Sequence, residues 1–249
     1  GEKFIRLHAK VKKRSWKEDE RILEEDVYPR WGKKKARNIT RTDVVSLLDE
    51  VAVRGPIMAN RTRSVLSKMF RWGAARGDIE GNPVEYTERP GKERKRERKL
   101  EVKQIPQFWT GLDEADIPQG RRIALRLLLV TLQRRKEVSL MRAAEIDETA
   151  AVWEIPGSKT KNGKLHKVPL SALALDLIRQ ARIEAALFYE CQPEDVEYLF
   201  PYRVKLGELK GQIAGLHKDA LTKALTDARP KIKAHISPHD LRRTAHTEM

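Results

Sequence analysis

Cysteine is nearly absent from this sequence. Cys191 is the only one among 249 residues, and a single thiol excludes an internal disulfide and any cysteine-rich zinc site. We expect it to be an ordinary buried thiol, and a reducing cytosol is the simplest location for such a chain. No metal site is expected either, because His166, His235 and His246 lack the spacing and the partners of one.

Long apolar segments are missing as well. The stretch "IALRLLLVTL" at residues 123–132 carries Arg126 and falls short of the roughly 20 apolar residues that a membrane-spanning helix needs. The first residues, "GEKFIRLHAKVKKR", do not resemble a signal peptide, and their abrupt start suggests that they continue a longer chain. We therefore expect a cytoplasmic protein without a contact to the membrane.

Acidic residues are too few to balance the basic ones. The formal net charge is +15, and residues 1–100 carry 27 basic against 16 acidic side chains. Such an excess indicates a polyanionic partner, and nucleic acid is favoured over a membrane surface because no amphipathic basic helix ends in an aromatic anchor. Charge alone leaves a second interpretation open, in which the basic face is merely solvated.

The first 86 residues predict a small helical domain. Two capping boxes, Ser15 to Glu18 and Thr40 to Asp43, mark the starts of helices. Apolar residues at helical spacing follow the second box as far as Gly55, and a third helix is expected over residues 59–77. A turn signal, "GNP" at residues 81–83, then ends the domain.

The rest of the chain predicts a linker and a mixed α/β domain. Residues 87–100, "TERPGKERKRERKL", contain seven basic residues and one apolar residue, so nothing in them is expected to pack. Such a segment acts either as a solvated tether or as a contact to a phosphate backbone. Residues 101–249 should form helices at 121–132, 136–142, 171–189 and 217–229, with a hairpin between residues 152 and 170 whose loop includes Asn162 and Gly163.

The last stretch, "SPHDLRRTAHTEM", contains a histidine and an arginine three residues apart. Ser237 is a good N-cap, Pro238 suits the first helical position and Asp240 completes a capping-box pattern. His239 and Arg242 therefore lie on one face of the first turns, where a helix start favours anions. A guanidinium and an imidazole there suit a phosphate, although this spacing is common on ordinary helix surfaces.

Two earlier stretches make the pair more specific. "TLQRRKEVSLMRAAEID" at residues 131–147 and "GSKTKNGKLHKVPLS" at residues 157–171 precede it, and the three together resemble the tyrosine recombinases, the phage integrase family. The resemblance is greatest to integrases of prophages and genomic islands. It assigns Arg134 and Glu137 to the first motif, Lys161 to the hairpin lysine, and His239 and Arg242 to the last motif.

The resemblance covers nearly the whole chain. The stretch "FRWGAARGDIEGNP" at residues 70–83 is similar to the end of the family's helical core-binding domain. We therefore expect a mainly α fold with a small β component, made of a core-binding domain at residues 1–86, a basic linker at 87–100 and a catalytic domain, truncated at its C-terminus, at 101–249. One position departs from the family: Leu132 stands where glycine is usual, two residues before Arg134.

The resemblance implies strand cleavage by a tyrosine hydroxyl, through a 3′-phosphotyrosyl intermediate and without a metal or other cofactor. Arg134 and Arg242 would stabilise the charged transition state, Lys161 would protonate the leaving 5′-oxygen, and His239 would assist proton transfer at the attacking hydroxyl. Glu137 would orient the arginines. The basic residues expected to contact DNA phosphates are Lys33, Lys34, Lys35, Arg37, Arg61, Arg63, Lys68, Arg71, Arg94, Lys95 and Arg96.

The attacking tyrosine itself is missing from residues 1–249. Every tyrosine lies upstream of His239, and none matches the nucleophile's position. We therefore expect DNA binding without strand cleavage from this stretch, which also lacks the family's N-terminal arm-binding domain. The full-length protein is expected to bind double-stranded attachment sites as a tetramer, with a directionality factor as a further partner, and to associate with the bacterial nucleoid when bound.

Other interpretations stay open. The runner-up is a non-catalytic DNA-binding or regulatory protein on an integrase scaffold, and a type IB topoisomerase would share the same chemistry. Residue by residue, Arg134, Arg135 and Lys136 could form a solvated basic corner and Glu137 could be a surface acid. Lys161 could be one lysine of a polar loop. Trp72 and Trp153 are expected in the cores.

Overall fold

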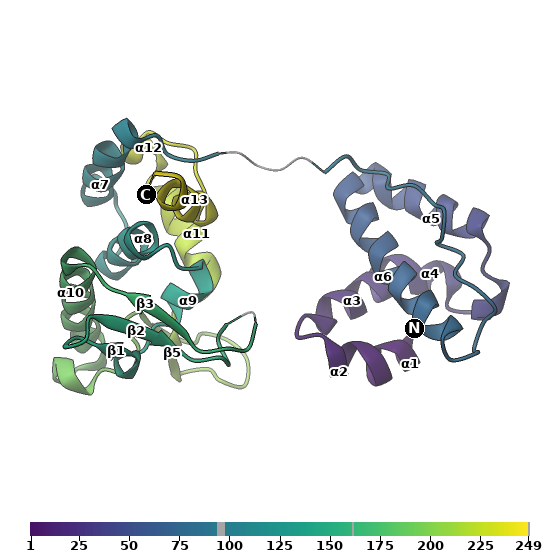
Figure 1. Ribbon diagram of the computed structural model, residues 1–249, viewed down its shortest axis with the longest axis horizontal. Coiled ribbons are helices and arrows are strands. Elements are labelled where there is room, and N and C mark those ends of the chain that lie inside the picture. Colours follow the sequence, from purple (N-terminus) through teal and green to yellow (C-terminus); the bar gives the residue numbers. More distant parts are fainter. Residues whose placement is uncertain (94–97, 161, 249) are drawn as a thin grey trace. The chain divides into compact units, whose positions relative to one another are not determined.

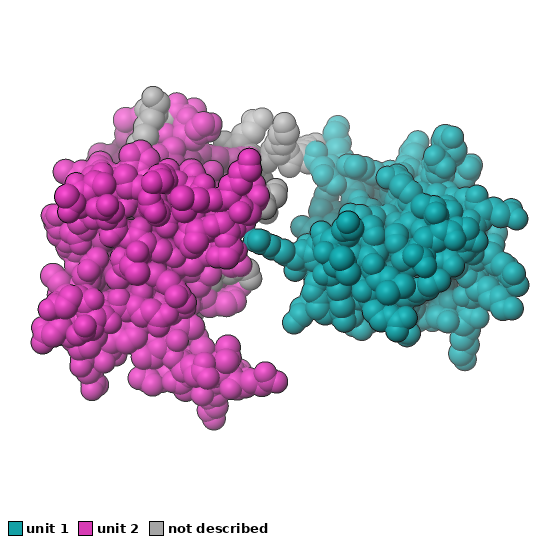
Figure 2. Space-filling view, turned by 60° about the horizontal axis from the view of Figure 1, so that its bottom comes forward, with its two compact units in different colours: residues 1–96 teal, residues 97–249 magenta. Residues whose placement is uncertain are grey.

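The computed structural model describes residues 1–93, 98–160 and 162–248. Its chain divides into two compact units, residues 1–96 and residues 97–249, which are coloured separately in Figure 2. Helices dominate both units, and within the described residues the strands lie in the second one (Figure 1). The expected mainly α fold with a small β component is confirmed.

Unit 1 is entirely helical over its described residues. Its elements are α1 (Glu2–Phe4), η1 (Ile5–Ala9), α2 (Lys10–Lys12), α3 (Trp16–Ile22), η2 (Leu23–Val27), α4 (Tyr28–Trp31), η3 (Ala36–Asn38), α5 (Arg41–Arg54) and α6 (Pro56–Ala74). The longest two, α5 and α6, pack against each other. Their inward faces bury Leu47, Leu48, Leu66 and Phe70 in one apolar core.

One of the two predicted capping boxes of unit 1 is confirmed. Thr40 accepts a hydrogen bond from the Asp43 backbone N–H at 3.2 Å, and the Asp43 carboxylate accepts one from the Thr40 N–H at 2.9 Å. The box at Ser15 is wrong: Ser15 precedes α3, but its side chain caps nothing. The Glu18 carboxylate accepts instead from Arg21, one turn further along the same helix.

Residues 87–93 pack against α6 of unit 1 and are not a solvated tether. The buried Asn60 on α6 donates to the Gly91 carbonyl at 2.8 Å and accepts from the Gly91 N–H at 3.0 Å. Arg63, one turn further along α6, donates to the carbonyl and hydroxyl oxygens of Thr87. The expectation that nothing in residues 87–100 packs is therefore wrong at this end. It is also wrong at the other, because Leu100 is fully buried in unit 2.

Unit 2 surrounds one central helix with other helices and small sheets. Its helices are η4 (Val102–Gln104), α7 (Ile105–Glu114), α8 (Gln119–Thr131), α9 (Arg135–Ser139), η5 (Ala143–Glu145), α10 (Ala172–Tyr189), η6 (Pro193–Asp195), α11 (Lys218–Asp227), α12 (Arg229–Ile232) and α13 (Pro238–Glu248). The apolar α8 packs against α10, α11 and α13 (Figure 1). Burial on several sides explains why residues 123–130 are apolar except for Arg126, which is itself buried.

The predicted hairpin is present and gains a third strand. The strands β1 (Ile146–Asp147), β2 (Val152–Ile155) and β3 (His166–Pro169) form an antiparallel sheet in that order. Trp153, which pairs with Val168, is fully buried, as predicted, whereas Trp72 of unit 1 is only partly buried. A second sheet pairs β4 (Pro201–Arg203) with β5 (Ile213–Gly215).

Two helices of unit 2 meet at a glycine. A Cβ atom on Gly111 of α7 would come within 2.6 Å of the Lys231 carbonyl oxygen and 2.8 Å of the Ile232 Cα atom, both on α12. Gln107 of α7 also donates to the Lys231 carbonyl at 2.8 Å. The two backbones can approach this closely only because residue 111 has no side chain.

Cys191 differs from its prediction. It is partly exposed just after α10, and its thiol donates to the Gln192 carbonyl at 3.3 Å. The apolar positions of α10 belong to other residues, such as Leu177, Ile178 and Ala181. A hydrogen-bonded position after the helix therefore replaces the expected buried one.

Candidate active site and basic surfaces

Arg134 and Glu137 form the first part of the candidate site. The helix α8 ends at Thr131, and the following Leu132 adopts a left-handed conformation with φ of 56°. Arg134 then stands immediately before α9. The Glu137 carboxylate accepts from the Arg134 backbone N–H at 2.7 Å and from its Nη1 at 2.8 Å. The Glu137 side chain is 3% exposed and that of Arg134 is 49% exposed. A buried acid thus holds an arginine whose guanidinium faces solvent.

His239 and Arg242 start the helix α13. Ser237 donates to the Asp240 carboxylate from its N–H at 2.9 Å and its hydroxyl at 2.8 Å, so the predicted helix start is confirmed. Thr244, deeper in the helix, accepts from the Leu100 N–H at 2.8 Å. The helix is therefore fixed at both of these turns, with His239 exposed and Arg242 partly buried.

The two arginines lie close enough to affect each other. Burial lowers the pKa of Arg242, repulsion by Arg134 lowers it further, and attraction to Glu137 acts in the opposite direction. Two guanidinium groups kept together despite their repulsion are arranged for an anion with several oxygens. The structure thus brings Arg134, Glu137 and Arg242 together from α9 and α13, with His239 one turn before Arg242.

Lys161 lies outside the described residues, but the loop around it is held firmly. Lys159 donates to the Leu140 carbonyl at 2.6 Å and forms an ion pair with Glu145. The Glu145 carboxylate also accepts from the indole N–H of the buried Trp153 at 3.2 Å. Leu140 directly follows α9, so this contact joins the hairpin loop to the helix that Arg134 precedes.

Lys159 has a role that the sequence pattern does not indicate. Its partner Glu145 is distant in the sequence, and no local pattern marks such a pair. Arg135 was similarly unassigned: its guanidinium lies 3.4 Å from the Asp219 carboxylate and also donates to Thr222, both on α11. Arg135 is thus bound to α11, which argues against the alternative of a freely solvated basic corner.

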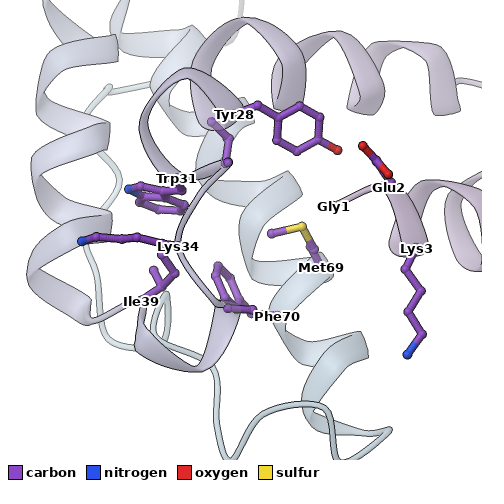
Figure 3. Close-up of a pocket in the computed structure, with 12 residues that line it drawn as sticks. Gly1, Glu2, Lys3, Tyr28, Trp31, Lys34, Ile39, Met69 and Phe70 are labelled. Atoms are coloured by element: carbon purple, nitrogen blue, oxygen red, sulfur yellow. The ribbon is translucent and has the colours of Figure 1, made fainter.

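The predicted DNA contacts of unit 1 fall into two groups. Lys33, Lys34, Lys35 and Arg37 are exposed between α4 and α5. Lys34 pairs with Asp43 at 2.8 Å, and hydrogen bonds from Lys34 and Thr40 lower the pKa of Asp43 to about 2. The aliphatic part of Lys34 lines a pocket beside Tyr28, Trp31 and Phe70, where Figure 3 shows mostly apolar side chains.

The second group lies along one face of α6. Arg61, Ser64, Lys68 and Arg71 follow one another at spacings of three or four residues and form a solvent-facing row, named here the α6 stripe. Arg63 is partly buried and holds Thr87 instead. Arg94, Lys95 and Arg96 lie outside the described residues.

The described residues offer neither a metal site nor a membrane-spanning helix. No group of three or more histidine, cysteine, aspartate or glutamate side chains could hold a metal ion there. In the same part of the chain, no helix has the length and apolar character to cross a membrane.

Comparison with known proteins identifies the family. Residues 98–249 match the phage integrase family, and residues 2–89 match the phage integrase central domain. The chain belongs to the phage integrase family and is thus a tyrosine recombinase by descent, as the sequence motifs predicted.

The chain is similar to prophage integrases of Escherichia coli. The chain is 31% identical over 159 residues to the prophage integrase IntZ of Escherichia coli K12, a match that covers 63% of this chain and 39% of IntZ. It is 27% identical over 205 residues to the prophage integrase IntA of the same organism, covering 78% of this chain and 47% of IntA. The chain thus spans less than half the length of these two relatives.

Solved structures share the fold. A lambda integrase fragment, residues 75–356, crystallised as a dimer on a COC′ core site, has a TM-score of 0.72 at 17% identity, covering 99% of this chain and 86% of that one. The Tn1549 transposon integrase bound to transposon right end DNA also gives 0.72, at 19% identity, covering 99% of this chain and 84% of its own. These likenesses confirm the predicted tyrosine recombinase fold.

Proposed function

We propose that this chain is the core-binding and catalytic part of a site-specific DNA recombinase that integrates or excises a mobile element. The observation that carries the proposal is the meeting of Arg134, Glu137 and Arg242 at one place. A solvated basic corner would not need a buried acid to fix one arginine beside another. The relatives support the proposal, since solved neighbours include a lambda integrase tetramer bound to a Holliday junction.

The proposed chemistry assigns one task to each residue. Arg134 and Arg242 stabilise the non-bridging oxygens of the pentavalent transition state, where negative charge accumulates. Glu137 keeps the Arg134 guanidinium in place. His239, exposed near the N-terminus of α13, takes part in proton transfer at the attacking hydroxyl, and Lys161 protonates the leaving 5′-oxygen.

Double-stranded DNA is the proposed partner. The α6 stripe and residues 33–37 supply phosphate contacts from unit 1, and neutralising phosphates with cations releases counterions. The affinity of the chain for a mixed-sequence duplex should therefore fall steeply with salt, which fluorescence anisotropy can measure. The active full-length assembly is proposed to be a tetramer on DNA, with a directionality factor selecting excision.

Strand cleavage needs a tyrosine that residues 1–249 do not supply after Arg242. We propose that this stretch alone binds DNA without forming a covalent bond. Incubation with a nicked duplex followed by denaturing electrophoresis tests this, and a phosphotyrosyl adduct formed by residues 1–249 alone would refute it.

The catalytic proposal is tested by Arg134→Ala in protein expressed from the whole reading frame. Cleavage of the cognate duplex should fall by about 10²-fold or more, because a preorganised charge is lost from the transition state. Duplex affinity should change only a few-fold. The alternative, a non-catalytic DNA-binding protein on the integrase scaffold, predicts no cleavage before or after the substitution.

A further inference from the structure

A hollow of about 600 Å³ lies on unit 1 beside the α6 stripe. Its lining includes four cationic side chains, Arg63, Lys68, Arg71 and Arg89, and none of the described residues that line it is acidic. Arg63 is fixed by its hydrogen bonds to Thr87. Within the described part of the chain, Lys68 and Arg71 have no ion-pair partner, so their charges are free for an external anion.

His8 also lines this hollow, and its surroundings are unusual for an imidazole. Its ring stacks on Phe4 at 5.3 Å between centroids and lies 6.1 Å from the Trp72 ring. Its Nε2 atom is shielded from solvent and has no hydrogen-bond partner among the described residues. An unsatisfied ring nitrogen costs free energy and favours any change that provides a hydrogen-bond partner.

The charges around His8 all have the same sign. The helix α2, which packs against η1, supplies Lys12, and α6, whose Trp72 lies beside the ring, supplies Lys68; within the described residues, no carboxylate of α1 or α3 is among the charges that shift the pKa of His8. Burial first, and then the charges of Lys68 and Lys12, lower the pKa of His8. The free protein therefore keeps this ring neutral at neutral pH.

We propose that this hollow is a phosphate subsite for DNA, in which Lys68 and Arg71 hold the anion and His8 takes up a proton when it binds. The inference rests on the proposed function, because the phosphate is part of a duplex bound by unit 1. A phosphate beside Lys68 offsets the repulsion that disfavours the charged ring. Since the bound form then has the higher affinity for protons, the affinity for DNA rises as pH falls.

A fall in pH has the opposite effect on the stability of the free protein. A histidine with a lowered pKa in the folded state is stabilising above its unfolded value and becomes destabilising as pH falls through that value. Free unit 1 therefore loses stability below about pH 6.5, the ordinary value for histidine. DNA binding and folding respond to acid in opposite directions through the same ring.

The first experiment measures duplex affinity by anisotropy at low, constant salt between about pH 7.5 and pH 5.5, where histidine titrates. Wild-type affinity should rise by up to about tenfold for each unit by which DNA raises the pKa of His8. His8→Phe keeps an aromatic ring for stacking but cannot titrate, and it should lose this gain. His166→Gln, an exposed change in unit 2, should keep it. The same pH dependence in His8→Phe would overturn the proposal.

A second measurement does not depend on the folding of a variant. Nuclear magnetic resonance titration of the His8 ring in the wild-type chain should give a higher pKa with the duplex than without it. Lys68→Gln should raise the pKa in the free protein and shrink the further rise on DNA binding. An unchanged His8 pKa in DNA-bound protein overturns the subsite, whereas failure of the chain to bind any duplex at low salt overturns the proposed function.

Discussion

The α6 stripe of unit 1 and the arginine site of unit 2 use cations in different ways. Lys68 and Arg71 stand on a solvent-facing helix surface with no carboxylate partner among the described residues. Arg134, by contrast, is held by the buried Glu137. A phosphate backbone can be bound by mobile charges at many places, whereas a single reacting phosphate needs charges held in one geometry. We therefore expect the cations of the α6 stripe to bind DNA and those of the arginine site to stabilise one reacting phosphate.

The largest expected effect comes from the anchor of the hairpin in unit 2. Glu145→Ala removes the ion pair with Lys159 and leaves the indole N–H of Trp153 without its acceptor. Breaking a largely buried pair from one side costs about 3 kcal/mol, which urea unfolding should show. The matched control is Glu154→Ala in the same sheet, whose pair with Lys167 is exposed to solvent and should therefore contribute much less to stability. An equal loss in the free energy of unfolding for both variants would show that Glu145 does not anchor the hairpin loop.

The next effect tests the support of Arg134. Glu137→Ala removes two hydrogen bonds to a charged acceptor and should lower the free energy of unfolding by about 2 kcal/mol. Glu137→Gln keeps an acceptor and should recover part of this loss. Thermal unfolding should rank the wild type as most stable, Glu137→Gln as intermediate and Glu137→Ala as least stable. An unchanged stability in Glu137→Ala would mean that the pair does not fix Arg134.

The third effect concerns unit 1 and should appear in binding rather than in stability. Replacing Lys68 and Arg71 together by glutamine should reduce the steepness of the salt dependence of DNA affinity by about two phosphate contacts. The free energy of unfolding of this double variant should stay within about 0.5 kcal/mol of the wild-type value. Arg63→Gln is the control with the reverse result, because Arg63 holds Thr87 and should affect stability first. Loss of stability in the double variant would show that Lys68 and Arg71 stabilise unit 1 and are not reserved for DNA.

The smallest effect compares two left-handed residues of unit 2. Lys233 is exposed at the end of α12 with φ of 50°, so Lys233→Gly should stabilise the protein by about 0.5 kcal/mol or more. Leu132 has φ of 56° but also packs against the core. Leu132→Gly should therefore change stability little, since relief of strain is offset by lost burial. A clear gain at both positions would show that the packing of Leu132 contributes nothing.

Local patterns were sufficient for some features and not for others. The capping box at Thr40 and the start of α13 were predicted correctly, because each depends on residues three positions apart. The box at Ser15 failed because Arg21 competes for the carboxylate of Glu18. The meeting of Arg134 with Arg242 could be inferred only from the family's motifs, since nothing in their own neighbourhoods brings α9 and α13 together.

Pairs distant in the sequence were the hardest to predict. Lys159 has no local feature that distinguishes it from other lysines of its loop, yet it donates to the Leu140 carbonyl. Arg63 lies among residues of the α6 stripe, and only the position of Thr87 shows that it faces another way. The hollow beside His8 likewise depends on η1 and α6 coming together.

The missing side chain at Gly111 has a consequence for the arginine site. Because the backbones of α7 and α12 are in contact there, a methyl group at residue 111 would clash with α12 and push the two helices apart. The helix α12 leads through Lys233 into α13, which carries His239 and Arg242. A side chain at residue 111 would therefore disturb the helix that precedes α13, and we expect Gly111→Ala to shift Arg242 relative to Arg134, although residue 111 contacts neither arginine.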